Sequence, residues 1–177
     1  MRVGIADHLG WAIAVIADDQ HAVVDRRRIA LVEPGVTPAP IHYDNGDLDV
    51  GGTEALVRTV RASVLRASAA ALDALPGPIE SLSLRFWPLD FPDAIEVQMR
   101  VPWEARADAV MYRVLLAELA HERGWEVHCY DAKTVEAQAT DLLGERAYAV
   151  LHGLGPPWTK DHRAALAATV LASATGP

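Results

Sequence analysis

Two aspartate–histidine pairs, Asp7-His8 and Asp161-His162, stand near opposite ends of the chain, and side chains of these types can serve as ligands. Each aspartate also has a purely structural explanation. An aspartate at the end of a short strand can accept hydrogen bonds from the amides of the following turn. An aspartate in the first turn of a helix is stabilised by the helix dipole, by roughly 0.3–1 kcal/mol. The residue types therefore leave a functional and a structural interpretation open for both pairs.

Polar and aromatic residues elsewhere offer two further sites. Asp131 and Lys133 follow an expected strand, so they either form a polar site at its carboxyl end or cap the next helix. Trp87, Trp103 and Trp158 each lie next to or near a proline. They either pack in the core and loops or present an aromatic surface on which a base or a protein partner could stack.

The length of 177 residues fits a single domain with one substantial core. The net charge of −8 argues against tight, nonspecific binding of nucleic acid, because clustered Lys and Arg normally neutralise the phosphates. Arginines at 26–28, and at 100, 106 and 113, form either local basic patches or solvated faces.

The single cysteine and the short apolar runs indicate the redox compartment of the protein and its relation to membranes. Cys129 cannot form a disulfide within the chain, so we expect a reducing cytoplasm. The apolar run at 11–17 is too short to cross a bilayer and is expected to be a buried strand. We therefore expect no association with membranes.

The first third of the chain predicts an antiparallel meander followed by a long loop and a helix. Apolar runs at 3–7, 11–17 and 22–32 are separated by turn residues, which is typical of three antiparallel strands. Residues 35–52 are rich in Pro, Gly, Asp and Asn and predict an irregular loop, with a turn at Asp44-Asn45-Gly46. A helix is expected from about Thr53, as its N-cap, to about Leu75.

The remainder predicts helices alternating with strands. A strand with one buried face is expected at 79–87, followed by an insertion at 88–104 in which residues 94–101 could form a short edge strand. A helix returning into a strand indicates a parallel crossover. The later expected elements are a helix at 105–123, a strand at 125–130 and helices at 132–143, 145–151 and 159–173.

The order of these elements, and three short motifs, resemble the ribonuclease H-like fold and, within it, the Holliday-junction resolvases of the RuvC type. The opening Val-Gly-Ile-Ala-Asp7-His-Leu-Gly-Trp is similar to that family's first hairpin, and Ile79-Glu80 resembles an Ile-Glu pair on its fourth strand. The run from Asp161 to Ala167 resembles its final helix. The resemblance implies one α/β domain over residues 1–177, with a mixed sheet of three leading antiparallel strands and then parallel β-α units, and with helices on both faces.

The same resemblance implies a metal-dependent nuclease. Members of this fold hold two divalent cations in a cluster of acidic residues to cleave phosphodiester bonds. Asp7, Glu80 and Asp161 match three of the four expected positions and would bind Mg²⁺ or Mn²⁺, with His162 as a catalytic helper. Ile95-Glu96 is the same dipeptide, so Glu96 is an alternative to Glu80. The expected substrate is structured nucleic acid.

One position departs from the family pattern. The final helix normally carries two metal-binding positions three residues apart, and the second of these is Ala164. Two-metal chemistry tolerates few ligand losses. The alternative hypothesis is therefore a non-catalytic relative that retains the fold as a binding or homo-oligomerisation module, and whether the chain is an enzyme stays open.

Overall fold

A five-stranded mixed sheet forms the centre of the computed structural model, which describes residues 1–44 and 46–174. Asn45 of the expected turn and the last three residues lie outside the described residues. The strand order is β3-β2-β1-β4-β5. The first three strands pair antiparallel, whereas β4 and β5 run parallel to β1. The strands are β1 Arg2–His8, β2 Trp11–Ala17, β3 Val23–Ala30, β4 Ser81–Arg85 and β5 Glu126–Tyr130.

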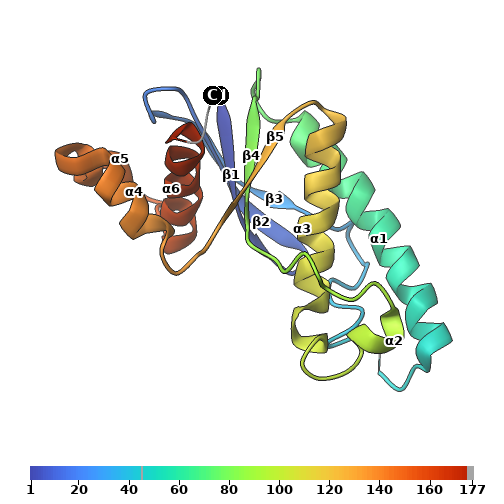
Figure 1. Cartoon of the computed structure of the whole chain (residues 1–177). Helices are drawn as coiled ribbons and strands as arrows, with labels where there is room; N and C mark the ends of the chain where they lie inside the picture. Colours follow the sequence, from blue (N-terminus) through green and yellow to red (C-terminus); the bar gives the residue numbers. More distant parts are fainter. Residues whose placement is uncertain (45, 175–177) are drawn as a thin grey trace.

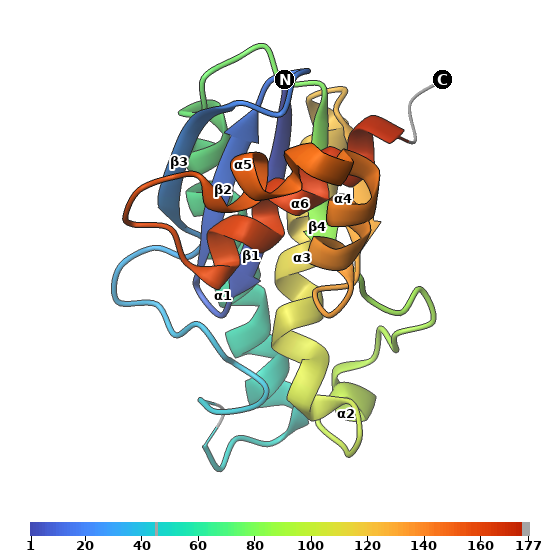
Figure 2. The ribbon, with the colours of Figure 1, turned by 90° about the vertical axis from the view of Figure 1, so that its left-hand side faces the viewer.

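Helices cover both faces of the sheet, as predicted (Figure 1). One layer contains the long helices α1 and α3, and the other contains α4, α5 and α6, which lie in front of the sheet in Figure 2. The helices are α1 Val50–Asp73, α2 Ile95–Gln98, α3 Glu104–Glu122, α4 Val135–Leu143, α5 Ala147–His152 and α6 Lys160–Ala174, with a 3-10 turn η1 at Gly144–Arg146. The expectation of an α/β fold with three antiparallel strands followed by parallel units is confirmed.

The alternation of side chains along β1 divides the core into two. Val3 and Ile5 belong to the cluster under α1 and α3, whereas Ala6 belongs to the cluster under α6. Strand β4 is buried on both faces, so the expectation of one buried face at 79–87 is wrong. The added layer is α6, whose small residues allow it to approach the sheet closely. A Cβ atom built on Gly4 would lie 1.9 Å from the carbonyl oxygen of Ala165 in α6.

Two local expectations are wrong. Helix α1 begins at Val50, because the side chain of Asp49 accepts a hydrogen bond from the Gly52 amide and caps it, and Thr53 is buried within the helix. The segment expected as an edge strand at 94–101 contains the short helix α2 instead. Prolines in the insertion remove donors that a strand would need. Among the described residues, no helix is both long enough and apolar enough to cross a membrane.

Candidate functional site

Asp7 is buried at the end of β1 and is held by two arginines. It is 3% exposed. Arg113 of α3 donates from Nε to Asp7 Oδ2 at 2.9 Å. Arg85, the last residue of β4, donates from Nη1 to the Asp7 carbonyl at 2.7 Å, and its Nε lies 3.9 Å from Asp7 Oδ1. A buried carboxylate needs cationic partners to offset its lost hydration, and guanidinium groups provide them here.

Asp161 is brought to the same end of the sheet by α6. It is in the first turn of that helix and accepts a hydrogen bond from His8 Nε2 at 2.9 Å. Arg85 donates from Nη2 to Asp161 Oδ1 at 3.3 Å. Arg85 therefore joins both carboxylates, and the chain's first strand and last helix meet at this arginine. We call Asp7, His8, Arg85, Arg113 and Asp161 the arginine–carboxylate cluster.

Glu80 is not part of the arginine–carboxylate cluster. It precedes β4, where its carboxylate lies 3.3 Å from the amino group of Met1 and is 65% exposed. The parallel register pairs Arg2 with Ser81, the residue that follows Glu80. Asp7 lies five residues beyond Arg2 along β1, which corresponds to roughly 17 Å. Glu96 is an exposed residue of α2 and pairs with Arg100. Neither alternative for the acid of the fourth strand reaches Asp7.

The side chain of His162 contacts the residues that precede α6. Its Nδ1 accepts a hydrogen bond from the Thr159 amide at 3.2 Å, and its ring lies 5.4 Å from the Trp158 ring. Burial is the main cause that lowers the pKa of His162, with Arg26 adding to the effect. The imidazole is therefore neutral near pH 7 and stabilises the turn that begins α6.

The donor set does not fit a pair of divalent cations. Mg²⁺ and Mn²⁺ prefer several oxygen ligands that converge on one point. Ala164 is buried in the core under α6 and supplies no oxygen. Among residues 1–44 and 46–174, no group of three or more His, Cys, Asp or Glu side chains could hold a metal ion. Arg85 and Arg113 already supply positive charge to Asp7, and they would repel a cation placed beside it.

The sequence did not predict two members of the arginine–carboxylate cluster, Arg85 and Arg113. Arg85 occupies the carboxyl end of β4, the opposite end from Glu80, which the resemblance named as the carboxylate of this strand, and it brings a positive charge to Asp161. Arg113 is grouped by sequence with Arg100 and Arg106, although only Arg113 of these three contacts Asp7. The available signal is that Arg85 is the last residue of a buried strand, at the carboxyl end where an open α/β sheet tends to place its functional residues.

Tyr130, at the end of β5, completes the buried surroundings of the arginine–carboxylate cluster. Its hydroxyl donates to the Ile5 carbonyl at 2.7 Å. Burial raises the pKa of Tyr130 well above its usual value, and the nearby Asp7 adds to this effect against the opposing influence of Arg85. The hydroxyl therefore keeps its proton at physiological pH and acts as a fixed donor that links β5 to β1.

Arginines and tryptophans form a surface beside the arginine–carboxylate cluster. The ring of Trp11 stacks on His8 at 4.1 Å between centroids, and the guanidinium carbon of Arg28 lies 4.4 Å from the Trp11 ring centroid. The guanidinium carbon of Arg26 lies 5.4 Å from the Trp158 ring centroid. We call Trp11, Arg26, Arg28 and Trp158 the arginine–tryptophan surface. This surface adjoins the arginine–carboxylate cluster, because His8 contacts both Asp161 of the cluster and Trp11 of the surface.

The other sequence candidates have structural contacts. Asp131 Oδ1 accepts a hydrogen bond from the Lys133 amide at 2.8 Å and closes the turn before α4, whose N-cap residue is Thr134, so the expectation that Asp131 caps this helix is wrong. Trp103 packs edge-on against Phe91, and Trp87 lines a groove beside the same loop. Trp158 lies apart from them under Arg26. The three tryptophans predicted as a candidate surface therefore do not form one.

No protein-family model matches the chain, and no curated protein matches it.

Proposed function

We propose that the chain is a ribonuclease H-like domain, related to the RuvC-type resolvases, that binds nucleic acid without two-metal cleavage. The observation that carries the proposal is the pairing of Asp7 and Asp161 with guanidinium groups instead of with further carboxylates. Three antiparallel strands followed by two parallel strands support the proposed fold. The nuclease with Mg²⁺ or Mn²⁺ at Asp7, Glu80 and Asp161 is the less supported hypothesis, because Glu80 lies at the opposite end of β4.

The arginine–tryptophan surface supports nucleic acid as the partner. Guanidinium groups pair with phosphates and stack on bases, and aromatic rings hold unstacked bases. Arg28 is exposed and ends the stack of His8 and Trp11, so its outer face is available to a base. The net charge of the chain is −8, so this basic surface is a local exception to the overall negative charge. We therefore expect nucleic acid to bind only weakly to the rest of the protein. Homo-oligomerisation stays a prediction.

Arg28→Gln is expected to weaken binding of a four-way DNA junction roughly fivefold, because it removes one phosphate or stacking contact. Fluorescence anisotropy with a labelled junction in EDTA measures this, and the slope of log K against log salt should fall by about one. Arg66→Gln is the matched control, since Arg66 is an exposed arginine of α1 paired with Glu33.

Equal affinities for the two variants would reject the arginine–tryptophan surface as the binding site. The same junction incubated with Mn²⁺ should stay intact. Cleavage of the junction by the wild type that is lost in both Asp7→Asn and Asp161→Asn would instead favour the nuclease hypothesis.

A further inference from the structure

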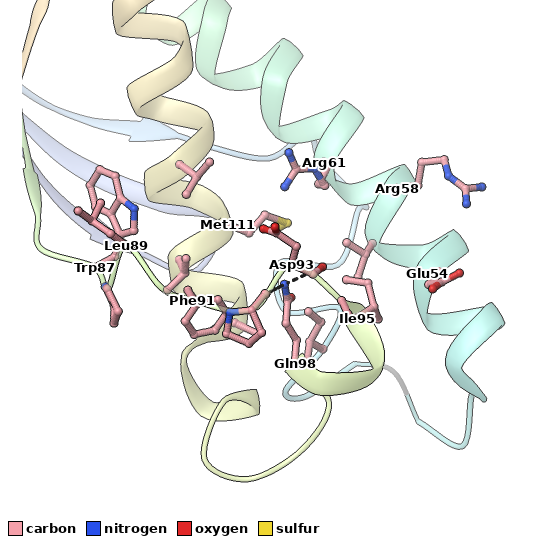
Figure 3. Close-up of a pocket in the computed structure, with 18 of the residues that line it drawn as sticks. Glu54, Arg58, Arg61, Trp87, Leu89, Phe91, Asp93, Ile95, Gln98 and Met111 are labelled. Atoms are coloured by element: carbon pink, nitrogen blue, oxygen red, sulfur yellow. Dashed lines mark hydrogen bonds between the residues drawn. The ribbon is translucent and has the colours of Figure 1, made fainter.

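A groove of about 630 Å³ lies between α1, α3 and the segment 87–98. Figure 3 shows its side chains converging from these three elements. The volume is in the range of sites that hold small organic molecules. The groove is separate from the arginine–carboxylate cluster, none of whose residues line it.

Apolar side chains form the walls. Val57 comes from α1, Met111 from α3, and Phe91 and Ile95 from the insertion. The loop 35–52 contributes Ile41. These residues come from four separate parts of the chain, so the groove is produced by the tertiary fold. An occupant would bury apolar surface against them, which is worth roughly 25 cal/mol per Å².

The loop that carries Ile41 is fixed to α3. Asp108 is buried and accepts hydrogen bonds from the Ile41 amide at 3.1 Å and the His42 amide at 3.0 Å. Burial is the main cause that raises the pKa of Asp108, while the two amides oppose the shift. This side of the groove is therefore preformed, which reduces the ordering cost of binding.

Among the described residues that line the groove, Arg61 is the one charged residue that is half-buried. The other charged lining residues are exposed, namely Glu54, Arg58, Asp93 and Glu118. Figure 3 shows Arg61 extending from α1 toward α3, whereas Arg58 extends away from the groove. Within the part of the chain that the structure describes, Arg61 forms no ion pair. A guanidinium beside apolar walls favours a carboxylate, which it can bind through two hydrogen bonds.

The acidic residues at the rim narrow the choice of ligand. Glu54, Asp93 and Glu118 would repel a molecule with several negative charges, such as a nucleotide. A single carboxylate placed at Arg61, with an apolar remainder along Phe91, Ile95 and Met111, satisfies both the cation and the apolar walls. We propose that the groove binds an apolar monocarboxylate, that is, an aliphatic or aryl carboxylic acid. This inference goes beyond the proposed function and does not depend on it.

Calorimetric titration of the full chain with decanoate tests the proposal, with decanol as the uncharged probe. Wild type is expected to bind decanoate saturably in a 1:1 complex and decanol more weakly. Arg61→Gln should lower the affinity for decanoate about tenfold or more, because charge-assisted hydrogen bonds are lost, and should leave that for decanol unchanged. Arg66→Gln is the control, because Arg66 is an arginine of the same helix that lies outside the groove lining, whereas Arg58 is part of that lining.

A second readout locates the ligand. The methyl NMR signals of Ile95 and Met111 should shift on addition of decanoate to wild type and shift less in Arg61→Gln. Absence of saturable binding, equal loss of affinity in Arg66→Gln, or methyl shifts confined to other regions would overturn the proposal. Affinity that falls as protein concentration rises would also overturn it, because it would assign the groove to a second copy of the chain.

Discussion

Arg113→Met is expected to lower the free energy of unfolding by about 3–5 kcal/mol, the usual cost of removing one partner from a buried ion pair. The substitution keeps a long apolar side chain but removes the guanidinium 2.9 Å from Asp7 Oδ2. Arg85 cannot fully replace it, because its Nε lies 3.9 Å from the other carboxylate oxygen. Urea denaturation followed by circular dichroism measures the loss.

Arg106→Met is the matched control, since Arg106 is an exposed residue of the same helix. It should change the free energy of unfolding by less than about 0.5 kcal/mol. Adding Asp7→Asn to Arg113→Met should recover much of the loss, because the double variant no longer buries an unpaired charge at this position. A loss for Arg113→Met no greater than that for Arg106→Met would contradict the assigned role of the pair.

Gly4→Ala is expected to lower the free energy of unfolding by about 3 kcal/mol or more. The new Cβ would lie 1.9 Å from the Ala165 carbonyl oxygen and 2.6 Å from its carbonyl carbon. Both atoms belong to the backbone of α6, which cannot move aside without shifting the helix that carries Asp161. The expected result is a lower urea midpoint together with a changed environment of His8, visible by NMR.

Gly51→Ala provides the contrast within the same chain. Gly51 is in the first turn of α1, and its new Cβ would come no closer than 3.7 Å to Asp49 Oδ1. Alanine should therefore stabilise the protein by about 0.4–1 kcal/mol, by reducing the freedom of the unfolded chain. If Gly4→Ala proved as mild as Gly51→Ala, the close contact between β1 and α6 would be wrong.

The elements of the fold could be predicted because their signals are local. The apolar runs that became β1 and β2, and the helix at 105–123 that became α3, each carry their periodicity within one segment. The insertion could not be predicted, because its alternation near Glu96 is compatible with either a strand or a short helix. Tertiary contacts decided between them.

The members of the candidate site could be predicted only in part. Asp7 and Asp161 meet at one end of the sheet because a strand end and a helix start both point there. Their arginine partners could not be identified, since Arg113 lies 106 residues from Asp7 and nothing local links the two. The register between β1 and β4 placed Arg85, and not Glu80, beside Asp7, and the sequence contains no local signal for that register.

Calorimetric titration with Mn²⁺, on wild type and on Asp7→Asn, tests most directly the claim that guanidinium groups take the place of metal ions beside Asp7 and Asp161. Both proteins are expected to give only the heat of dilution. Saturable binding by the wild type that Asp7→Asn abolishes would contradict this claim and would restore the metal-dependent nuclease as the leading hypothesis.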